Sequence, residues 1–395
     1  MPVFDSFYIA WKYVLFNKFK SVVLVTCITL IAFLPLSLEL LLKESEKQLM
    51  ARAASTPLLT GAKGSSLDLV MNSLYFDDEI PEPVTMSEVQ YVNETQLAMP
   101  IPLYVRFKAR GYPVVGTTLD YFDFRSLKIA SGNFLTLLGE SVLGATVAEQ
   151  LGLKPGDSLI SSPENLFDLA GVYPLKMKVA GILEKSNTAD DRAVFVDLKT
   201  AWIIQGLGHG HEDLSKIRDA TVILERTDTN VAANAKLEHY NEITKDNMDS
   251  FHFHGDLGAF PITALIAVPF DTKSETLLRG RYLTRQASIQ ILKPKDVIDG
   301  LLENIFKIKS LIDGVILLVG SATVLAIILV FALSLRIRKR EIATIFKLGC
   351  RRMTIARLMA AEICIIVLTS AVFCGGLVSL VDHFANDLVR ILVIR

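Results

Sequence analysis

The chain has 395 residues, 51% of them hydrophobic, and a formal net charge of −1 at pH 7. Its mean hydropathy of +0.40 is unusual for a soluble domain of this size and predicts a membrane protein, while the near-neutral charge gives no support to nucleic acid or an acidic substrate as partner. No cysteine lies between residues 44 and 300, so that region is predicted to contain no disulfide.

The N-terminal residues 1–20, "MPVFDSFYIAWKYVLFNKFK", mix aromatic residues and lysines, with apolar residues at helical spacing. This pattern predicts a cytoplasmic amphipathic helix that lies in the membrane interface, with aromatic rings at the level of the lipid headgroups. The alternative is that these residues simply begin the first membrane span.

Three apolar segments follow, each close to the roughly 20 residues that a helix needs to cross a bilayer. We expect each of them to be a transmembrane helix. The segments are residues 21–43, 306–335 and 358–381.

Orientation is predicted from the positive charges, because cytoplasmic loops carry an excess of Lys and Arg. The segment 336–357, between the second and third spans, contains eight such residues and one acidic residue. It is therefore expected in the cytoplasm with the N-terminus, while residues 44–305 and a short tail, 382–395, lie outside a plasma (inner) membrane. The eight cations are Arg336, Arg338, Lys339, Arg340, Lys347, Arg351, Arg352 and Arg357.

The region 44–305 is long enough for a globular domain and contains both strand-like and helix-like patterns. The predicted fold is an integral membrane α-helical protein with three spans and a large extracytoplasmic α+β domain, in two lobes, inserted between spans one and two. Strands are expected over 103–110, 175–183, 193–198, 220–224 and 287–292. Helices are expected over 141–152, 198–208 and 230–244.

The cytoplasmic segment contains "REIATIFKLG", which predicts a short helix with Ile342, Ile345 and Phe346 on one side and charges on the other. Gly349 is placed to end this helix, since glycine tolerates the left-handed conformation at a helix C-terminus. A small apolar surface with charged residues beside it is suited to docking into a groove of a partner protein. The alternative is that the cations serve only topology and contact with anionic lipid.

Three stretches together resemble the MacB/FtsX/LolC-LolE class of ATP-binding-cassette (ABC) permeases with a MacB-like periplasmic core domain. They are the N-terminus through "FKSVVLVTCITLIAF", the stretch "LGATVAEQLGLKPGDSLI" with "LKMKVAGILEKSNTADDRAVFVDLKTAW" after it, and "RKREIATIFKLGCRRMTIARLMAAE". On this resemblance, the residues expected to couple the chain to an ATPase are Arg340, Glu341, Ile342, Ile345, Phe346, Lys347, Gly349, Arg351, Arg352 and Glu362.

The resemblance implies a permease that dimerises with a second copy or a paralogue and binds a separate ABC ATPase. ATP-driven motion is then relayed to the periplasmic domain, a mechanism called mechanotransmission, to move or release a lipoprotein, lipid or peptide cargo. The class normally has four spans, and the residues from Phe384 onward are too few and too charged for another. We therefore expect a reduced set of spans, a sequence that lacks its end, or a partner that supplies the missing helix.

The chain itself is not expected to be an enzyme. It lacks the phosphate-binding pattern G-x-x-x-x-G-K-[ST], and "GAKGSS" at 61–66 does not fit it. ATP and magnesium are therefore expected in the partner ATPase. An alternative function is that of an FtsX-like regulator of an extracytoplasmic enzyme, without transport.

Two His-x-His pairs lie in the extracytoplasmic region, in "GHGHED" and "FHFHGD". Neutral imidazole binds Zn²⁺ and Cu²⁺, so a metal-handling periplasmic protein is a further alternative. The structural interpretation is that "FHFH" is a strand with both histidines on one face and both phenylalanines on the other, and that "GHGHED" is a polar loop after a helix. The candidate metal ligands are His209, His211, His252 and His254.

Overall fold

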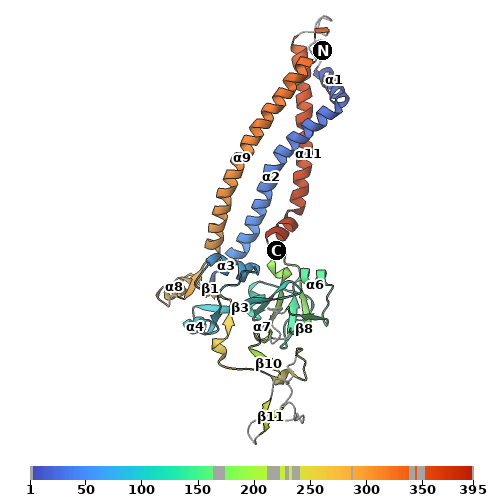
Figure 1. Ribbon diagram of the computed structural model, residues 1–395. Helices are drawn as coiled ribbons and strands as arrows, with labels where there is room; N and C mark the ends of the chain where they lie inside the picture. Colours follow the sequence, from blue (N-terminus) through green and yellow to red (C-terminus); the bar gives the residue numbers. More distant parts are fainter. Residues whose placement is uncertain are drawn as a thin grey trace. The chain divides into compact units, whose positions relative to one another are not determined.

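In the computed structural model the described residues are 3–162, 174–210, 223–226, 231–233, 241–285, 288–337, 343–344 and 352–393. The chain divides into two compact units, the first formed by Met1–Lys47 with Leu301–Arg395 and the second by Gln48–Gly300 (Figure 1). Helices α2 and α9 are each shared between them, since the last residues of α2 and the first residues of α9 fall in unit 2.

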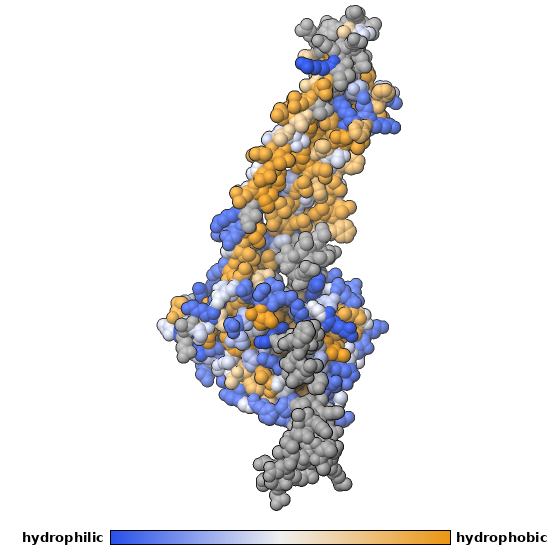
Figure 2. Space-filling view, in the orientation of Figure 1, coloured by the Kyte–Doolittle hydropathy of each residue, from blue (hydrophilic) through white to orange (hydrophobic). Residues whose placement is uncertain are grey.

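Among its described residues, unit 1 has helices as its only regular structure. Three of them are long and apolar enough to cross a membrane, and their outward side chains are largely hydrophobic (Figure 2). A shorter helix, α1, precedes them and ends at Phe16, so the N-terminal residues form a helix separate from the first long one. The helices are α1 (Val3–Phe16), α2 (Lys18–Ala54), α9 (Pro294–Ile337) and α11 (Arg352–Val393).

Helices α1, α2 and α11 pack through small side chains, as is usual where helices meet in a membrane. Ala10 of α1 is buried against Ala361 and Ile365 of α11. The hydroxyl of Thr29 in α2 donates to the carbonyl of Ser370 in α11 across 3.4 Å. Helix α11 continues through residues 382–393, where the sequence predicted a short tail.

Unit 2 is an α/β domain built on one ten-stranded mixed sheet, in the order β16-β1-β15-β3-β4-β9-β6-β8-β5 with β7 beside β8. The pairs β4–β9 and β6–β8 are parallel and the other pairs of the sheet are antiparallel. The sheet strands are β1 (Leu58–Ala62), β3 (Ala98–Ala109), β4 (Tyr112–Thr117), β5 (Ile129–Gly132), β6 (Glu140–Leu143), β7 (Ser158–Ile160), β8 (Lys176–Leu183), β9 (Val194–Asp197), β15 (Ala264–Pro269) and β16 (Ile289–Leu292).

Three small ribbons accompany the sheet: β2 with β14, β10 with β13, and β11 with β12. Their strands are β2 (Val84–Thr85), β10 (Gly208–Gly210), β11 (Ile223–Arg226), β12 (Val231–Ala233), β13 (Phe251–Phe253) and β14 (Pro261–Ile262). The helices of unit 2 are α3 (Ser66–Val70), α4 (Ser87–Thr95), α5 (Asp120–Phe124), α6 (Ala145–Leu151), α7 (Leu198–Gln205) and α8 (Thr272–Thr284), with short turns η1 (Met71–Tyr75), η2 (Ala189–Arg192), η3 (Met248–Ser250) and η4 (Leu257–Ala259).

Most of the predicted strands are confirmed, since residues 103–110, 175–183, 193–198 and 287–292 overlap β3, β8, β9 and β16. Two helix predictions were partly wrong. The range 141–152 begins as strand β6, because these apolar residues pair with β8 and β9, and only its second half is helix α6. In the range 230–244, residues 231–233 are strand β12, paired with β11.

Candidate functional site

Most of the predicted ATPase-coupling residues lie outside the described part of the chain. Arg352 is described as the first residue of α11, and Glu362 is buried in the same helix. The other predicted coupling residues, namely Arg340, Glu341, Ile342, Ile345, Phe346, Lys347, Gly349 and Arg351, lie outside the described residues.

Glu362 forms an ion pair inside unit 1. Its Oε1 lies 3.3 Å from Nζ of Lys20, at the start of α2. The carboxylate is nearly inaccessible, with 6% of its side chain exposed, and a charge in an apolar helix bundle is costly unless it is paired. The pair therefore links the start of α2 to α11 close to the predicted coupling segment.

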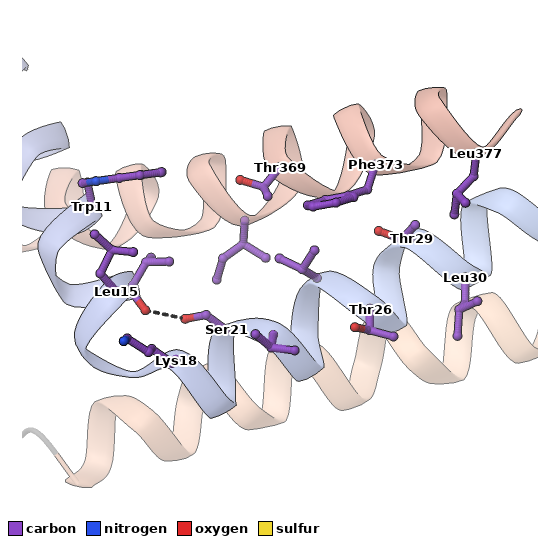
Figure 3. Close-up of a pocket in the computed structure, with 14 residues that line it drawn as sticks. Trp11, Leu15, Lys18, Ser21, Thr26, Thr29, Leu30, Thr369, Phe373 and Leu377 are labelled. Atoms are coloured by element: carbon purple, nitrogen blue, oxygen red, sulfur yellow. Dashed lines mark hydrogen bonds between the residues drawn. The ribbon is translucent and has the colours of Figure 1, made fainter. Parts of the chain in front are cut away.

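An apolar groove of about 570 Å³ lies in unit 1, between α1, α2 and α11 (Figure 3). Trp11 and Leu15 line one end, and Phe373 and Leu377 line the other. The hydroxyl of Ser21 points into the groove but donates to the carbonyl of Val14 at 3.0 Å. The groove is therefore suited to an apolar chain rather than to a polar ligand.

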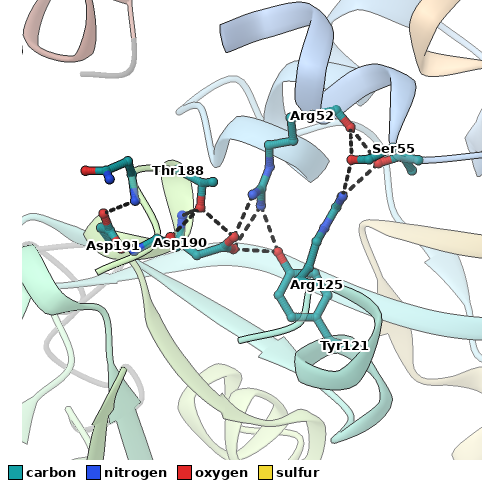
Figure 4. A network of polar contacts seen from close by, with 10 residues as sticks. Arg52, Ser55, Tyr121, Arg125, Thr188, Asp190 and Asp191 are labelled. Carbon is teal, nitrogen blue, oxygen red and sulfur yellow. Dashed lines mark hydrogen bonds and ion pairs between the residues drawn. The ribbon is translucent and has the colours of Figure 1, made fainter. Parts of the chain in front are cut away.

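A second ion pair, inside unit 2, holds the last turn of α2 (Figure 4). Arg52 meets Asp190 of η2 through both oxygens, with Nη1 to Oδ2 at 2.6 Å and Nη2 to Oδ1 at 2.9 Å. The hydroxyl of Tyr121 in α5 lies 2.8 Å from Nη2 and donates to Oδ1 at 2.7 Å. Both charged side chains are almost fully buried. A buried bidentate pair of this kind fixes distance and orientation together.

The turn that carries Asp190 is itself held by hydrogen bonds. Thr188 donates its hydroxyl to Asp190 at 2.9 Å, and its oxygen accepts from the Asp190 backbone N–H at 3.3 Å. The neighbouring Asp191 accepts the backbone N–H groups of Ser186 at 2.8 Å and Asn187 at 2.9 Å. Gly144 packs so closely on this turn that a Cβ there would lie 2.2 Å from the carbonyl oxygen of Asp190. The contacts of the turn itself therefore hold the Asp190 carboxylate in place, in addition to its pairing with Arg52.

The end of α2 has two further attachments within unit 2. Arg125 donates to the hydroxyls of Ser55 at 3.1 Å and Thr56 at 2.8 Å, directly after the last helical turn. Both hydroxyls also donate to the carbonyl of Arg52, one of the groups that a helix end leaves without an intrahelical partner. The hydroxyl of Tyr75 donates to the carbonyl of Leu49. The end of α2 is thus joined to η1, α5 and η2.

Burial and neighbouring charges shift the pKa values of Asp190 and Tyr121 in this network. Burial by itself would raise the pKa of Asp190, but the charge of Arg52, its hydrogen bonds and that from Tyr121 outweigh burial and lower the pKa to about 2. Burial raises the pKa of Tyr121 well above its usual range, so its hydroxyl stays protonated and remains a donor. At neutral pH the pair therefore consists of the Arg52 cation and the Asp190 anion, with Tyr121 as a neutral donor.

Acid is expected to weaken this attachment. The carboxylate of Asp190 has a lower pKa in the folded state, so its stabilisation is complete above the unfolded value near 3.8 and is lost as the pH falls towards about 2. The shift corresponds to roughly 2 kcal/mol. In unfolding titrations at a series of pH values, the stability difference between wild type and Asp190→Asn should therefore narrow below about pH 4. A difference that stays constant from neutral pH to pH 2.5 would contradict the assignment.

Sequence reasoning missed this network. Arg52 stands among alanines at the end of a long apolar helix, and Asp190 lies in a turn rich in polar residues, 138 positions away. A lone arginine on an otherwise apolar helical turn was the available signal, because such a charge needs a partner when it is buried. The sequence alone does not say which of many acidic residues supplies that partner.

The structure brings three of the four candidate metal ligands together. His209 of β10 pairs directly with His252 of β13. His254 lies two residues after His252, just beyond the end of β13. Their ring centroids are 4.8 to 5.1 Å apart, and their ligand atoms all lie within 4.8 Å of one another. His211 lies outside the described residues. The predicted alternation is confirmed, since Phe251 and Phe253 occupy the opposite face.

Comparison with known families gives a match for residues 46–240, to the family described as MacB-like periplasmic core domain. No curated protein matches the chain. The matched range includes Arg52, Asp190 and His209, and extends from the end of α2 through most of unit 2.

Three solved structures that the chain resembles share little sequence with it. The periplasmic region of MacB from Actinobacillus actinomycetemcomitans is 13% identical, with a TM-score of 0.35 over 65% of this chain and 98% of that one. The extracellular domain of YknZ, a noncanonic ABC-type transporter from Gram-positive bacteria, is 12% identical, with a TM-score of 0.33 over 60% of this chain and 99% of that one. A domain of a putative permease from Porphyromonas gingivalis is 11% identical, with a TM-score of 0.27 over 60% and 86%.

Proposed function

We propose that this chain, which carries a MacB-like periplasmic core domain over residues 46–240, is the permease subunit of an ABC complex in the plasma (inner) membrane. The observation that carries the proposal is the match of this domain in a chain that also has three helices able to cross a membrane. A separate ATPase binds and hydrolyses ATP, and the permease relays its motion to the domain outside.

The relay runs through α2. Lys20 near its start pairs with Glu362 of α11, and Arg52 near its end pairs with Asp190 of η2. Both cations belong to one helix, Lys18–Ala54. A displacement at Lys20 is then carried along α2 to Arg52, through the turn that contains Pro35, whose missing N–H removes one helical hydrogen bond. Helix α11 begins at Arg352, inside the segment 336–357 on which the ATPase is proposed to act.

The cargo is proposed to be handled outside the membrane by unit 2 and not to pass between the spans. In the described residues, the groove in unit 1 is mostly apolar, and the hydroxyls of Ser21, Thr29 and Thr369 in its lining donate to backbone carbonyls. A lipoprotein, lipid or peptide that the domain moves or releases fits this arrangement better than a soluble ion or sugar that must cross the bilayer. The working assembly is a permease dimer with its ATPases.

The natural cysteine Cys350 tests both the orientation and the docking, because it lies in the segment 336–357. Replacing Cys27, Cys364 and Cys374 by alanine leaves it as the only thiol. A membrane-impermeant maleimide is expected to label Cys350 in inside-out vesicles and not in intact cells. Labelling should slow when the ATPase that co-purifies with the chain is bound, since docking covers the segment.

The matched control places a reporter in unit 2. Ile80 is exposed in the domain, so Ile80→Cys in the cysteine-free background should show the opposite pattern, with labelling in intact cells only. Labelling of Cys350 from outside would refute the orientation. An unchanged labelling rate with the ATPase bound would refute the docking site.

A further inference from the structure

We propose that His209, His252 and His254 form a binding site for a divalent transition-metal ion, with Zn²⁺ as the ion to test, on the ribbon formed by β10 and β13. This site is separate from the ATP-driven relay and does not depend on it. Two imidazoles from the paired strands and a third from the residue just after β13 converge there, and imidazole nitrogen is a preferred ligand of Zn²⁺ and Cu²⁺.

The register of the ribbon places the three rings on one face. Residues directly opposite in an antiparallel pair point to the same side of the ribbon, so His209 and His252 lie side by side. His254 is two positions beyond His252, and alternate residues of an extended strand share a face. The convergence of the rings therefore follows from backbone pairing rather than from chance rotamers.

The opposite face fixes the ribbon to the domain. The ring of Phe253 covers Gly208 and the ring of Phe251 covers Gly210, where a Cβ on either glycine would lie 2.6 Å from a ring carbon. Phe253 packs edge-on against Trp202 of α7, at 6.4 Å between ring centroids. The indole N–H of Trp202 donates to the carbonyl of Pro261 at 2.8 Å. The histidine face is thus presented by a ribbon that rests on the hydrophobic core.

The geometry is close to that of a bound ion. With zinc–nitrogen bonds of about 2.0–2.1 Å, ligand nitrogens around a tetrahedral ion lie about 3.4 Å apart. The separations here, all within 4.8 Å, need shifts of about 1 Å or less in each ring to reach that geometry. His254 can supply much of this adjustment, because its side chain is exposed and it is followed by Gly255, whose φ is +94°.

One ring is also oriented by its surroundings. Nδ1 of His252 lies 3.0 Å from the carbonyl oxygen of Ser250. A carbonyl can only accept a hydrogen bond, so Nδ1 carries the proton and Nε2 keeps its lone pair for an ion. Zinc-binding histidines commonly use their second nitrogen in this way, which fixes the tautomer and strengthens the ligand.

Three protein ligands leave one position of a tetrahedral ion to water or to a donor from outside the chain. The ion would also join β10 to β13, which are separated in sequence by residues 211–250. Bound metal therefore gives the domain both a cross-link between β10 and β13 and an exchangeable coordination position on its surface.

The test uses the full chain purified in detergent without a polyhistidine tag, stripped with a chelator and then equilibrated with Zn²⁺. We expect about one zinc per chain by elemental analysis and a zinc-dependent rise in melting temperature. Both should be lost in His209→Asn and in His252→Asn. His383→Asn, which changes a histidine of α11 in unit 1, should behave as wild type.

Folding of the variants is checked by comparing metal-free proteins, whose circular dichroism and melting temperatures should equal those of metal-free wild type. Cu²⁺ provides a second readout, because electron paramagnetic resonance resolves coupling to imidazole nitrogen. That coupling should diminish in His252→Asn. A metal-free wild type after equilibration, or zinc that remains in both cluster variants, would overturn the proposal.

Discussion

Replacing Asp190 by asparagine is expected to lower the free energy of unfolding of unit 2 by about 3–5 kcal/mol, because removal of one partner leaves the Arg52 charge buried without its counterion. The two side chains are 6% and 2% exposed, so water cannot readily take over the lost interaction. Urea unfolding of the full chain in mild detergent measures the change. Trp202 reports on unit 2 alone once the chain's other tryptophan is changed, in a Trp11→Phe background.

A surface ion pair in the same unit is the matched control. Lys108 lies 2.7 Å from Asp78, but both side chains are well exposed. Asp78→Asn should therefore cost less than about 1 kcal/mol. The double variant Arg52→Met with Asp190→Leu should recover much of the loss, since it buries no unpaired charge. If Asp190→Asn were as mild as Asp78→Asn, the buried pair would not hold the end of α2.

Replacing Gly144 by alanine is expected to destabilise unit 2 by about 3 kcal/mol or more, because the added Cβ meets backbone that cannot rotate away. That Cβ would lie 2.2 Å from the carbonyl oxygen of Asp190 and 2.5 Å from the carbonyl carbon of Asp191. The turn must shift, and the Asp190 carboxylate shifts with it. The same urea titration gives the loss of stability, and hydrogen exchange of residues 48–54 should rise as the last turn of α2 is released.

Gly64→Ala is the control for this substitution, because no atom lies within 4 Å of the position a Cβ would take there. It should leave stability unchanged within about 0.5 kcal/mol. An increase in exchange confined to the turn around Asp190, with residues 48–54 as protected as in wild type, would show that the turn and the end of α2 are not coupled.

The sequence predicted the long helices well, because uninterrupted apolar runs of this length have few other stable forms in a membrane. It also predicted strands β3, β8 and β9, where apolar and β-branched residues recur. The segment 141–152 was harder, because "SVL" before Gly144 is compatible with either structure. Pairing with β8 and β9, which are distant in sequence, decides it in favour of strand β6.

The histidine cluster and the Arg52–Asp190 pair differ in how much of each could be predicted from the local sequence pattern. The alternation in "FHFH" was sufficient to place two histidines on one face. The third, His209, comes from a strand whose pairing with β13 no local pattern specifies. The Arg52–Asp190 pair depends entirely on the tertiary fold, because neither residue has a neighbour in sequence that indicates its partner.

This ion pair also constrains how the protein can change over generations. A single neutral replacement at Arg52 or Asp190 leaves the other charge buried and alone, whereas a joint exchange for two apolar residues does not. An evolutionary path from the charged pair to an apolar contact therefore passes through an intermediate of low fitness. Related proteins are expected to keep both residues or to have replaced both, even though 138 positions separate them.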